Sequence, residues 1–270
     1  MVVYISEFDI GDRGKNYRRA NDGHPYARAF EILHMLKYVN PQEGQTIVEF
    51  GTGNGILTMP LAKAVEQKGK VITLDDSVGA LEGIRSKARE HGLAIEPVLQ
   101  DQSYFETGRT SLPDSVADTV TSIATMHHYD ENKEMAFREF YRLLKPGGTL
   151  VIADVADNTA PQRYFDGFVH YVCSVGHDHR FLDKRQTEDL CKKTNLELCS
   201  WHLEFVPWVF DSEEQAMRFL HRLHDATCAP QESLEGAMRY LRTFELEGRF
   251  ALSWELFYAV VRKEGGAGVF

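Results

Sequence analysis

The chain has 270 residues, 43% of them hydrophobic, enough to bury one good core and marginal for two, so we expect one α/β domain. Forty Asp and Glu residues outnumber thirty Lys and Arg residues, and the formal net charge of -10 disfavours nucleic acid as a substrate. The four cysteines lack metal-site spacing, no secretion signal is recognisable, and no segment approaches the roughly twenty apolar residues of a membrane span, so we expect a cytoplasmic protein outside the membrane.

Helical and strand-like segments alternate along the first part of the chain. Apolar residues recur every three to four positions between residues 25 and 40, which predicts an amphipathic helix closed by Asn40 and Pro41. Short β-like runs separated by helical stretches follow, and this order predicts a doubly wound, Rossmann-like parallel sheet with helices on both faces. The expected strands are residues 46–50, 70–74, 95–99, 117–123 and 149–155.

The later part of the chain has a different pattern. Residues 196–210 form one long strand-like run, and residues 250–263 alternate like a final strand. Between them lie two helical stretches, residues 212–226 and 233–246. We therefore expect a helical insertion between the last two strands of the sheet.

Three glycines, Gly51, Gly53 and Gly55, directly follow the strand at residues 46–50. At the first strand-to-helix turn of a doubly wound sheet, such glycines let the backbone come close to a ligand. A dinucleotide site has the spacing GxGxxG, but Ile56 occupies the place of its third glycine, and Glu49 is a poor neighbour for a pyrophosphate. An NAD-dependent oxidoreductase is therefore disfavoured.

Acidic residues follow the next two strands. Asp75 ends the run VITLD and could accept hydrogen bonds from both ribose hydroxyls, and Asp76 could serve if the register is shifted by one. Asp101 follows the third strand, where it could accept a hydrogen bond from an adenine amino group. Because ligands of open α/β sheets bind at the carboxyl ends of the strands, these acids indicate a nucleoside-containing cofactor.

These motifs, VEFGTGNG, VITLDDS, VLQDQ, LPDSVADTVTSIATMHH and EFYRLLKPGGTLVIADV, resemble the class I S-adenosylmethionine-dependent methyltransferases, in particular the small-molecule group that includes the ubiquinone and menaquinone methyltransferases. The resemblance implies a sheet of seven strands with the last antiparallel, and S-adenosyl-L-methionine as cofactor. It also implies the methionine moiety over Gly51 to Gly55, the ribose on Asp75, and the adenine beside Asp101 and Gln102. The expected cofactor-binding residues are Glu49, Gly51, Thr52, Gly53, Asn54, Gly55, Asp75, Asp76, Asp101 and Gln102.

His127, His128 and Tyr129 follow the fourth strand, at the edge where the cofactor is expected. Methyl transfer is an in-line displacement at an activated methyl group, so the protein mainly has to align the acceptor with it. Phenols, alcohols and enols gain from a general base. His127 and His128 are therefore candidate catalytic bases, and the alternative is that they only shape the pocket wall.

A second cluster, His170, His177, Asp178 and His179, could bind a divalent metal, but solvated histidine-rich loops are common, and we expect no metal here. Tyr17, His24, Tyr129 and Tyr171 are candidate substrate-pocket residues. Other aromatic residues could wall the pocket, although each is also a reasonable core residue. These are Tyr164, Phe165, Phe168, Trp201, Phe205, Trp208 and Phe210.

We expect a single methyltransferase domain over residues 1–265 that acts on a small-molecule acceptor. Its expected parts are an N-terminal lid (1–40), a cofactor-binding core (41–155), substrate-cap segments (156–183 and 206–248), a final strand (249–263) and a disordered tail (264–270). The alternative is a protein of the same fold that binds the cofactor without transferring methyl. The acceptor atom and the oligomeric state stay open.

Overall fold

The computed structural model describes residues 5–265 and contains one seven-stranded sheet with the strand order β3-β2-β1-β4-β5-β10-β6. All pairs from β3 to β5 are parallel, and β10 is antiparallel to both β5 and β6. This confirms the predicted doubly wound sheet of seven strands with the last strand antiparallel. The strands are β1 Thr46–Phe50, β2 Lys70–Asp75, β3 Ile95–Leu99, β4 Ala117–Ile123, β5 Leu144–Asp154, β6 Leu196–Phe205 and β10 Glu255–Lys263.

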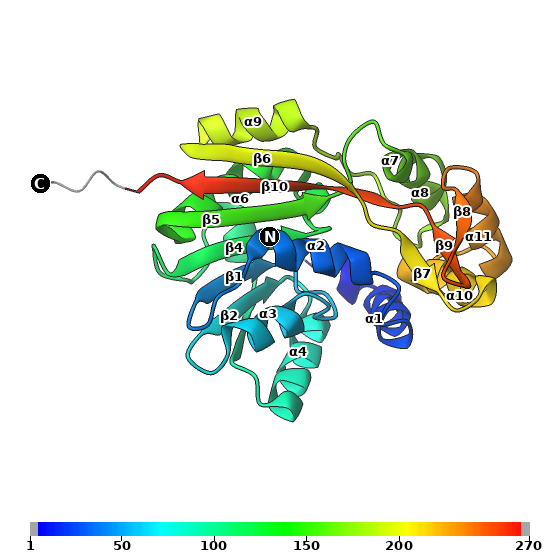
Figure 1. The fold of residues 1–270 in the computed structure, drawn as a ribbon, viewed down its shortest axis with the longest axis horizontal. Coiled ribbons are helices and arrows are strands. Elements are labelled where there is room, and N and C mark those ends of the chain that lie inside the picture. Colours follow the sequence, from blue (N-terminus) through cyan, green and yellow to red (C-terminus); the bar gives the residue numbers. More distant parts are fainter. Residues whose placement is uncertain (1–4, 266–270) are drawn as a thin grey trace, which may run out of the picture.

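Helices cover both faces of this sheet, because the central strands are apolar on both sides. Ile47 belongs to the core under α2 and α3, whereas Val48 and Phe50 belong to the core under α6 and α9. Figure 1 shows α2 and α3 on the near side of the sheet. The helices of this layer system are α2 Ala29–Val39, α3 Thr58–Val65, α4 Val78–His91, α5 Gln102–Thr107, α6 Lys133–Leu143 and α9 Lys184–Lys193.

Local sequence explains several helix ends. Asn40 ends α2 in the left-handed conformation, so the helix predicted for residues 25–40 ends where expected. Ser77 caps α4 by accepting a hydrogen bond from the Ala80 N–H, and Gly92 ends that helix. Both ends of α4 are thereby fixed, which places its first turn at the carboxyl end of β2.

The insertion between β6 and β10 is more than the expected pair of helices. The strand predicted for residues 196–210 breaks at Pro207, which has no N–H to donate to a sheet, and the chain continues in a separate three-stranded sheet of order β7-β9-β8. The expected helix at 233–246 ends at Met238, and the chain then pairs as a hairpin. The insertion contains β7 Trp208–Phe210, α10 Glu213–Leu223, α11 Pro230–Met238, β8 Thr243–Leu246 and β9 Arg249–Leu252.

The segment after β5 begins as a helix, whereas residues 176–180 of its histidine-rich part have no regular structure, as the sequence predicts. It contains α7 Ala160–Tyr164, the π-helix η3 Phe165–Val169 and the short α8 His170–Val172. In Figure 1 these helices gather with α10, α11 and the small sheet beyond one end of the main sheet. The two expected cap segments are thus neighbours in space.

The N-terminal segment links the main sheet to the insertion. It consists of the 3-10 turn η1 Glu7–Asp9 and the helix α1 Arg13–Gly23, and α1 packs against α10. Ser6 Oγ donates to Asp76 Oδ1 at 2.7 Å. Asp9 accepts from Ser77 Oγ at 2.7 Å and from the Val78 N–H at 3.1 Å. The segment therefore closes over the carboxyl end of β2.

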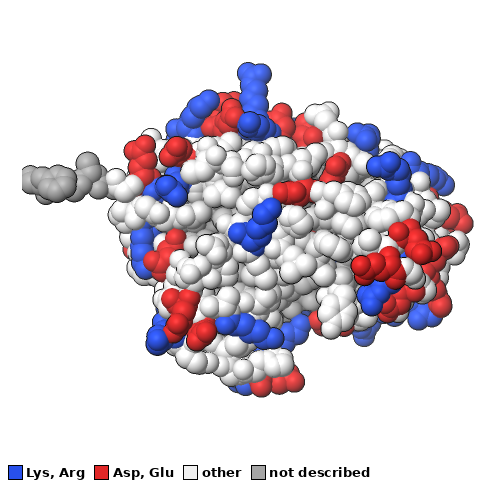
Figure 2. Space-filling model, viewed as in Figure 1, with Lys and Arg blue, Asp and Glu red and all other residues white. Residues whose placement is uncertain are grey.

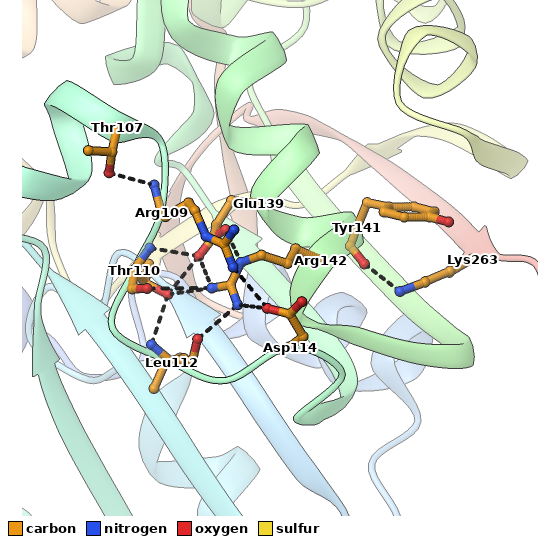
Figure 3. A network of polar contacts seen from close by, with 9 residues as sticks. All are labelled: Thr107, Arg109, Thr110, Leu112, Asp114, Glu139, Tyr141, Arg142 and Lys263. Atoms are coloured by element: carbon orange, nitrogen blue, oxygen red, sulfur yellow. Dashed lines mark hydrogen bonds and ion pairs between the residues drawn. The ribbon is translucent and has the colours of Figure 1, made fainter.

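A buried ion pair fixes the loop between α5 and β4. Arg142 donates to Glu139 at 2.6 Å and 2.7 Å, and Glu139 in turn accepts from the Thr110 N–H at 2.8 Å. Arg142 also donates to the Leu112 carbonyl and to Asp114 (Figure 3). This network holds the loop between α5 and β4 against α6, at the edge of the sheet opposite the cofactor motifs.

Charged side chains of both signs are mixed on the face drawn in Figure 2, and no broad field of Lys and Arg covers that face of the described chain. None of the described helices combines the length and apolar character that crossing a membrane requires. The four cysteines are all free thiols. Residues 266–270 of the tail expected to be disordered lie outside the described residues.

Candidate active site

A cavity of about 390 Å³ opens at the carboxyl ends of the parallel strands. One wall comes from the glycine loop after β1 and from the ends of β2 and β4. The opposite wall comes from the N-terminal segment, the turn around residue 177 and the insertion. The cavity therefore lies where the strand-end motifs predict a ligand, and residues of the segments expected to form the cap line it.

The glycine loop has two roles. Gly51 (φ +81°) and Gly53 (φ +53°) line the cavity, and a Cβ on Gly51 would lie 2.1 Å from Thr125 Oγ1. Gly55 does not line the cavity, and a Cβ there would lie 2.4 Å from Ile84 Cδ1. The first two glycines keep the cavity wall bare, whereas Gly55 lets α4 pack closely.

Asp75 is 8% exposed and lines the cavity at the end of β2. Its two oxygens accept from the N–H groups of Gly53 and Ser77, both at 2.9 Å, so it also positions the glycine loop and the start of α4. Burial raises the pKa of Asp75 to about 7, and the neighbouring charge of Asp76 adds to this rise. Asp76 lines the cavity beside it.

Glu49 lies beneath the loop rather than on the cavity wall. Its Oε2 accepts from Thr58 Oγ1 at 2.6 Å and from Thr73 Oγ1 at 2.7 Å, whereas its Oε1 has no hydrogen-bond partner among the described residues. Burial raises the pKa of Glu49 to about 7. Its observed role is to join β1 to α3 and β2 under the loop.

Thr52 and Asn54 of the glycine loop are also expected to contact the cofactor. Thr52 Oγ1 hydrogen bonds to Thr58 Oγ1 at 2.8 Å, and Asn54 Nδ2 donates to Asp22 at 3.3 Å. Neither lines the cavity. The structure therefore assigns both side chains to the support of the loop.

At the third strand, the residues next to the predicted ones line the cavity. Asp101 caps α5 by accepting from the Tyr104 N–H, Gln102 donates to Glu106, and neither residue lines the cavity. Gln100 and Phe105 line it instead, and Gln100 donates to the Tyr129 hydroxyl at 3.0 Å. The cap preference of Asp explains the difference.

Four imidazoles, those of His127, His128, His177 and His179, lie together on the cavity wall. Asp154 accepts from the backbone N–H of His127 at 3.1 Å, and its Oδ1 lies 2.8 Å from His127 Nδ1. Burial, followed by the neighbouring imidazoles, lowers the pKa of His128, His177 and His179, so these three rings stay neutral near pH 7.

The far wall carries a buried ion pair that the sequence patterns did not reveal. Arg28 donates to Glu31 Oε2 at 2.7 Å and 2.9 Å, and the indole N–H of Trp208 donates to Glu31 Oε1. Arg28, Glu31 and Trp208 all line the cavity, as do Trp254 and His224. The three-residue spacing of Arg28 and Glu31 along an apolar helix face is the one local signal for this pair.

The remaining pocket candidates divide into two groups. Those that line the cavity are Tyr17, Tyr129, Phe165 and Trp208. Those that do not are His24, Tyr164, Phe168, His170, Tyr171, Asp178, Trp201, Phe205 and Phe210. Tyr171 is 75% exposed, and His24 packs its ring against Phe210 and Phe219 instead. Exposure and core packing, respectively, account for these two corrections.

The known proteins that this chain resembles are methyltransferases. Residues 47–148 match a family described as a methyltransferase domain. An uncharacterized methyltransferase of Geobacillus sp. (strain WCH70) is 33% identical over 153 residues, covering 54% of this chain and 67% of that protein. The ubiquinone/menaquinone biosynthesis C-methyltransferase UbiE of Escherichia fergusonii is 32% identical over 115 residues, covering 42% of this chain and only 43% of UbiE.

A solved structure supports the same fold. A SAM dependent methyltransferase from Aquifex aeolicus has a TM-score of 0.57 with this chain at 16% sequence identity. The similarity covers 93% of this chain and 98% of that one. At this identity the likeness concerns the fold alone, whereas the Geobacillus relative carries the similarity in sequence.

Proposed function

We propose a function that proceeds from one premise: the chain belongs to the class I S-adenosylmethionine-dependent methyltransferases. It is therefore an enzyme that uses S-adenosyl-L-methionine. Within that activity, we propose that the methyl acceptor is a small molecule. We further propose that the N-terminal segment and the insertion act as its lid.

One observation carries this proposal: a single cavity is lined both by the predicted cofactor motifs and by residues of the insertion. Gly51, Gly53 and Asp75 line one end, and Trp208 and Trp254 line the other. A methyl transfer by in-line displacement needs cofactor and acceptor in a single water-excluding space. Because the N-terminal segment and the insertion enclose that space, it suits a small acceptor better than a folded macromolecule.

The residues at the glycine-loop end fit the cofactor. Bound there, S-adenosyl-L-methionine supplies a methyl group that is already activated on sulfur. We propose that Asp75 accepts hydrogen bonds from the ribose hydroxyls and that the bare backbone at Gly51 and Gly53 faces the methionine moiety. The side chains of Gln100 and Phe105, which line the cavity, would face the adenine.

At the other end, we propose that His127 contacts the acceptor. Asp154 holds its Nδ1 at 2.8 Å, which leaves Nε2 as the ring nitrogen that can accept a hydrogen bond. Such a bond would orient an acceptor that carries an O–H or N–H group. The apolar rings of Phe165, Trp208 and Trp254 favour an acceptor with an aromatic or otherwise apolar body.

A labelling experiment tests the acceptor class. The protein is incubated with S-adenosylmethionine carrying a deuterated methyl group and with a cell extract divided by ultrafiltration into small molecules and macromolecules. Mass spectrometry should find labelled product in the small-molecule fraction, and the Asp75→Asn variant should give much less at the same cofactor concentration. Label that appears only in protein or nucleic acid would contradict the proposal.

We also propose a cytoplasmic location. All four cysteines are free thiols in the structure, and two of them, Cys173 and Cys191, are buried. Unpaired cysteines are typical of reducing compartments. Labelling that distinguishes reduced from oxidised thiols in cells should therefore find all four cysteines in the reduced form.

A further inference from the structure

Three metal-binding side chains from distant parts of the chain meet on the cavity wall. Glu7 belongs to the N-terminal segment, His128 follows β4, and His179 follows α8. One ligand atom from each lies within 4.8 Å of the other two. We propose that Glu7, His128 and His179 form a binding site for a divalent first-row transition-metal ion.

Two of the three distances between these atoms suit a shared ion. His128 Nδ1 lies 3.2 Å from His179 Nε2 and 3.3 Å from Glu7 Oε1. Ligands held about 2.0 to 2.1 Å from a tetrahedral zinc ion lie about 3.3 Å apart. Two imidazoles and one carboxylate are also a donor set that several divalent transition metals accept.

Neighbouring groups orient the ligands. Asp130 Oδ2 lies 3.1 Å from His179 Nδ1, an arrangement that places the ring proton on Nδ1 and leaves Nε2 bare for a metal. Carboxylates that support ligating histidines in this way are a regular feature of metal sites.

A third imidazole adds an independent observation. The Nδ1 atom of His177 is buried without a hydrogen-bond partner among the described residues, and its ring centre lies 4.7 Å from that of His179. Arg13 opposes the site, because it donates to Glu7 Oε1 at 3.1 Å. Two carboxylates, those of Glu7 and Asp130, contact the proposed ligand set beside that one guanidinium.

This inference deepens the proposed function and rests on it for the role of the ion. Because all three ligands line the cavity, open coordination positions would face the acceptor. An acceptor with two neighbouring oxygen donors would then be held by the ion inside the cavity. The ion would also join the N-terminal segment to the sheet.

Metal binding can be measured without cofactor or acceptor. The untagged full chain is treated with a chelator, dialysed and titrated with ZnCl2 by calorimetry, and with Co²⁺ followed by visible absorbance. We expect one Zn²⁺ per chain. Glu7→Gln, His128→Gln and His179→Gln should each weaken binding at least tenfold, whereas His202→Gln, an exposed histidine on β6, should bind like the wild type.

Circular dichroism shows which variants are folded, and any two folded ligand variants suffice for the comparison. The inference is overturned if the wild type binds no Zn²⁺ at 100 µM, or if folded ligand variants bind it with wild-type affinity. The labelling experiment gives an independent answer. Methylated small molecules without metal binding would refute only the metal site, and metal binding with labelled macromolecules alone would refute only the small-molecule acceptor.

Discussion

The role proposed for Asp75 can be tested with the variant Asp75→Asn. In the structure both carboxylate oxygens already accept a backbone N–H, from Gly53 and Ser77 at 2.9 Å. Asparagine has one acceptor oxygen in place of two, so it loses a loop contact as well as charge-assisted bonds to a ribose. Such bonds contribute about 1.5 to 3 kcal/mol, which corresponds to roughly 10- to 150-fold in affinity.

The pH dependence gives a second measure of the same role. Burial and the charge of Asp76 raise the pKa of Asp75 to about 7, so the carboxyl is increasingly protonated below that pH. If ribose binding needs the ionised form, wild-type affinity for the demethylated cofactor should rise about tenfold between pH 6 and pH 8. Asp75→Asn should show no such rise, because its amide does not titrate.

Calorimetry at pH 6, 7 and 8 measures both effects, and Asp101→Asn is the matched control. Asp101 was expected at the adenine from the sequence, but it caps α5 outside the cavity, and asparagine is an equally good cap. Its affinity should stay within twofold of the wild type. An Asp75→Asn variant that binds at pH 8 as tightly as the wild type would refute the assignment.

Four further changes test other parts of the structure. The wild type should lose about 3 kcal/mol of unfolding free energy as pH rises from about 4.5 through about 7, because the unfolded chain releases the Glu49 proton before the folded chain does. Glu49→Gln should not show this loss. Urea unfolding of both proteins at pH 5 and pH 8 measures it, and equal pH dependence of the two would contradict the expectation. Gly55→Ala (φ +85°, with a Cβ 2.4 Å from Ile84 Cδ1) should lower the free energy of unfolding by about 1 to 3 kcal/mol yet leave cofactor affinity of the folded protein near the wild type. Arg28→Met should lower the free energy of unfolding, measured by thermal unfolding, by about 3 to 5 kcal/mol, because it leaves the buried carboxylate of Glu31 unpaired. This loss should be smaller when Glu31→Leu is added. Tyr171→Ala should leave the acceptor KM unchanged, because that side chain is exposed, and a KM raised more than threefold would place it in the pocket after all.

The strand-end motifs were predictable because their information is local. A strand, a glycine turn and a following helix are adjacent in the sequence, and parallel pairing brings successive strand ends to one edge. Asp75 reaches the cavity for this reason. Gln100 and Asp101 are adjacent in the sequence, and the sequence alone does not show which of them caps the next helix and which lines the cavity.

The far wall of the cavity was not predictable in the same way. Trp254 and His224 reach it from the insertion, and Arg28 reaches it from α2, so their meeting depends on tertiary packing. The spacing of apolar residues predicts one helix over residues 233–246, whereas the chain forms strand β8 of the β8–β9 hairpin at residues 243–246. Gly248 is the local sequence signal for its turn, in which both Glu247 and Gly248 have positive φ.

The N-terminal segment makes hydrogen bonds at the place where a ribose would lie, through Ser6 to Asp76 and through Asp9 to Ser77 and Val78. If the N-terminal segment is the proposed lid, spent product would leave after these bonds break and the segment moves away from the cavity. Every catalytic cycle would then include one opening and one re-closing of the N-terminal segment. Such steps often limit turnover in enzymes with closing segments. The maximal rate would accordingly slow in a viscous solvent, even though the bond-making step does not depend on viscosity.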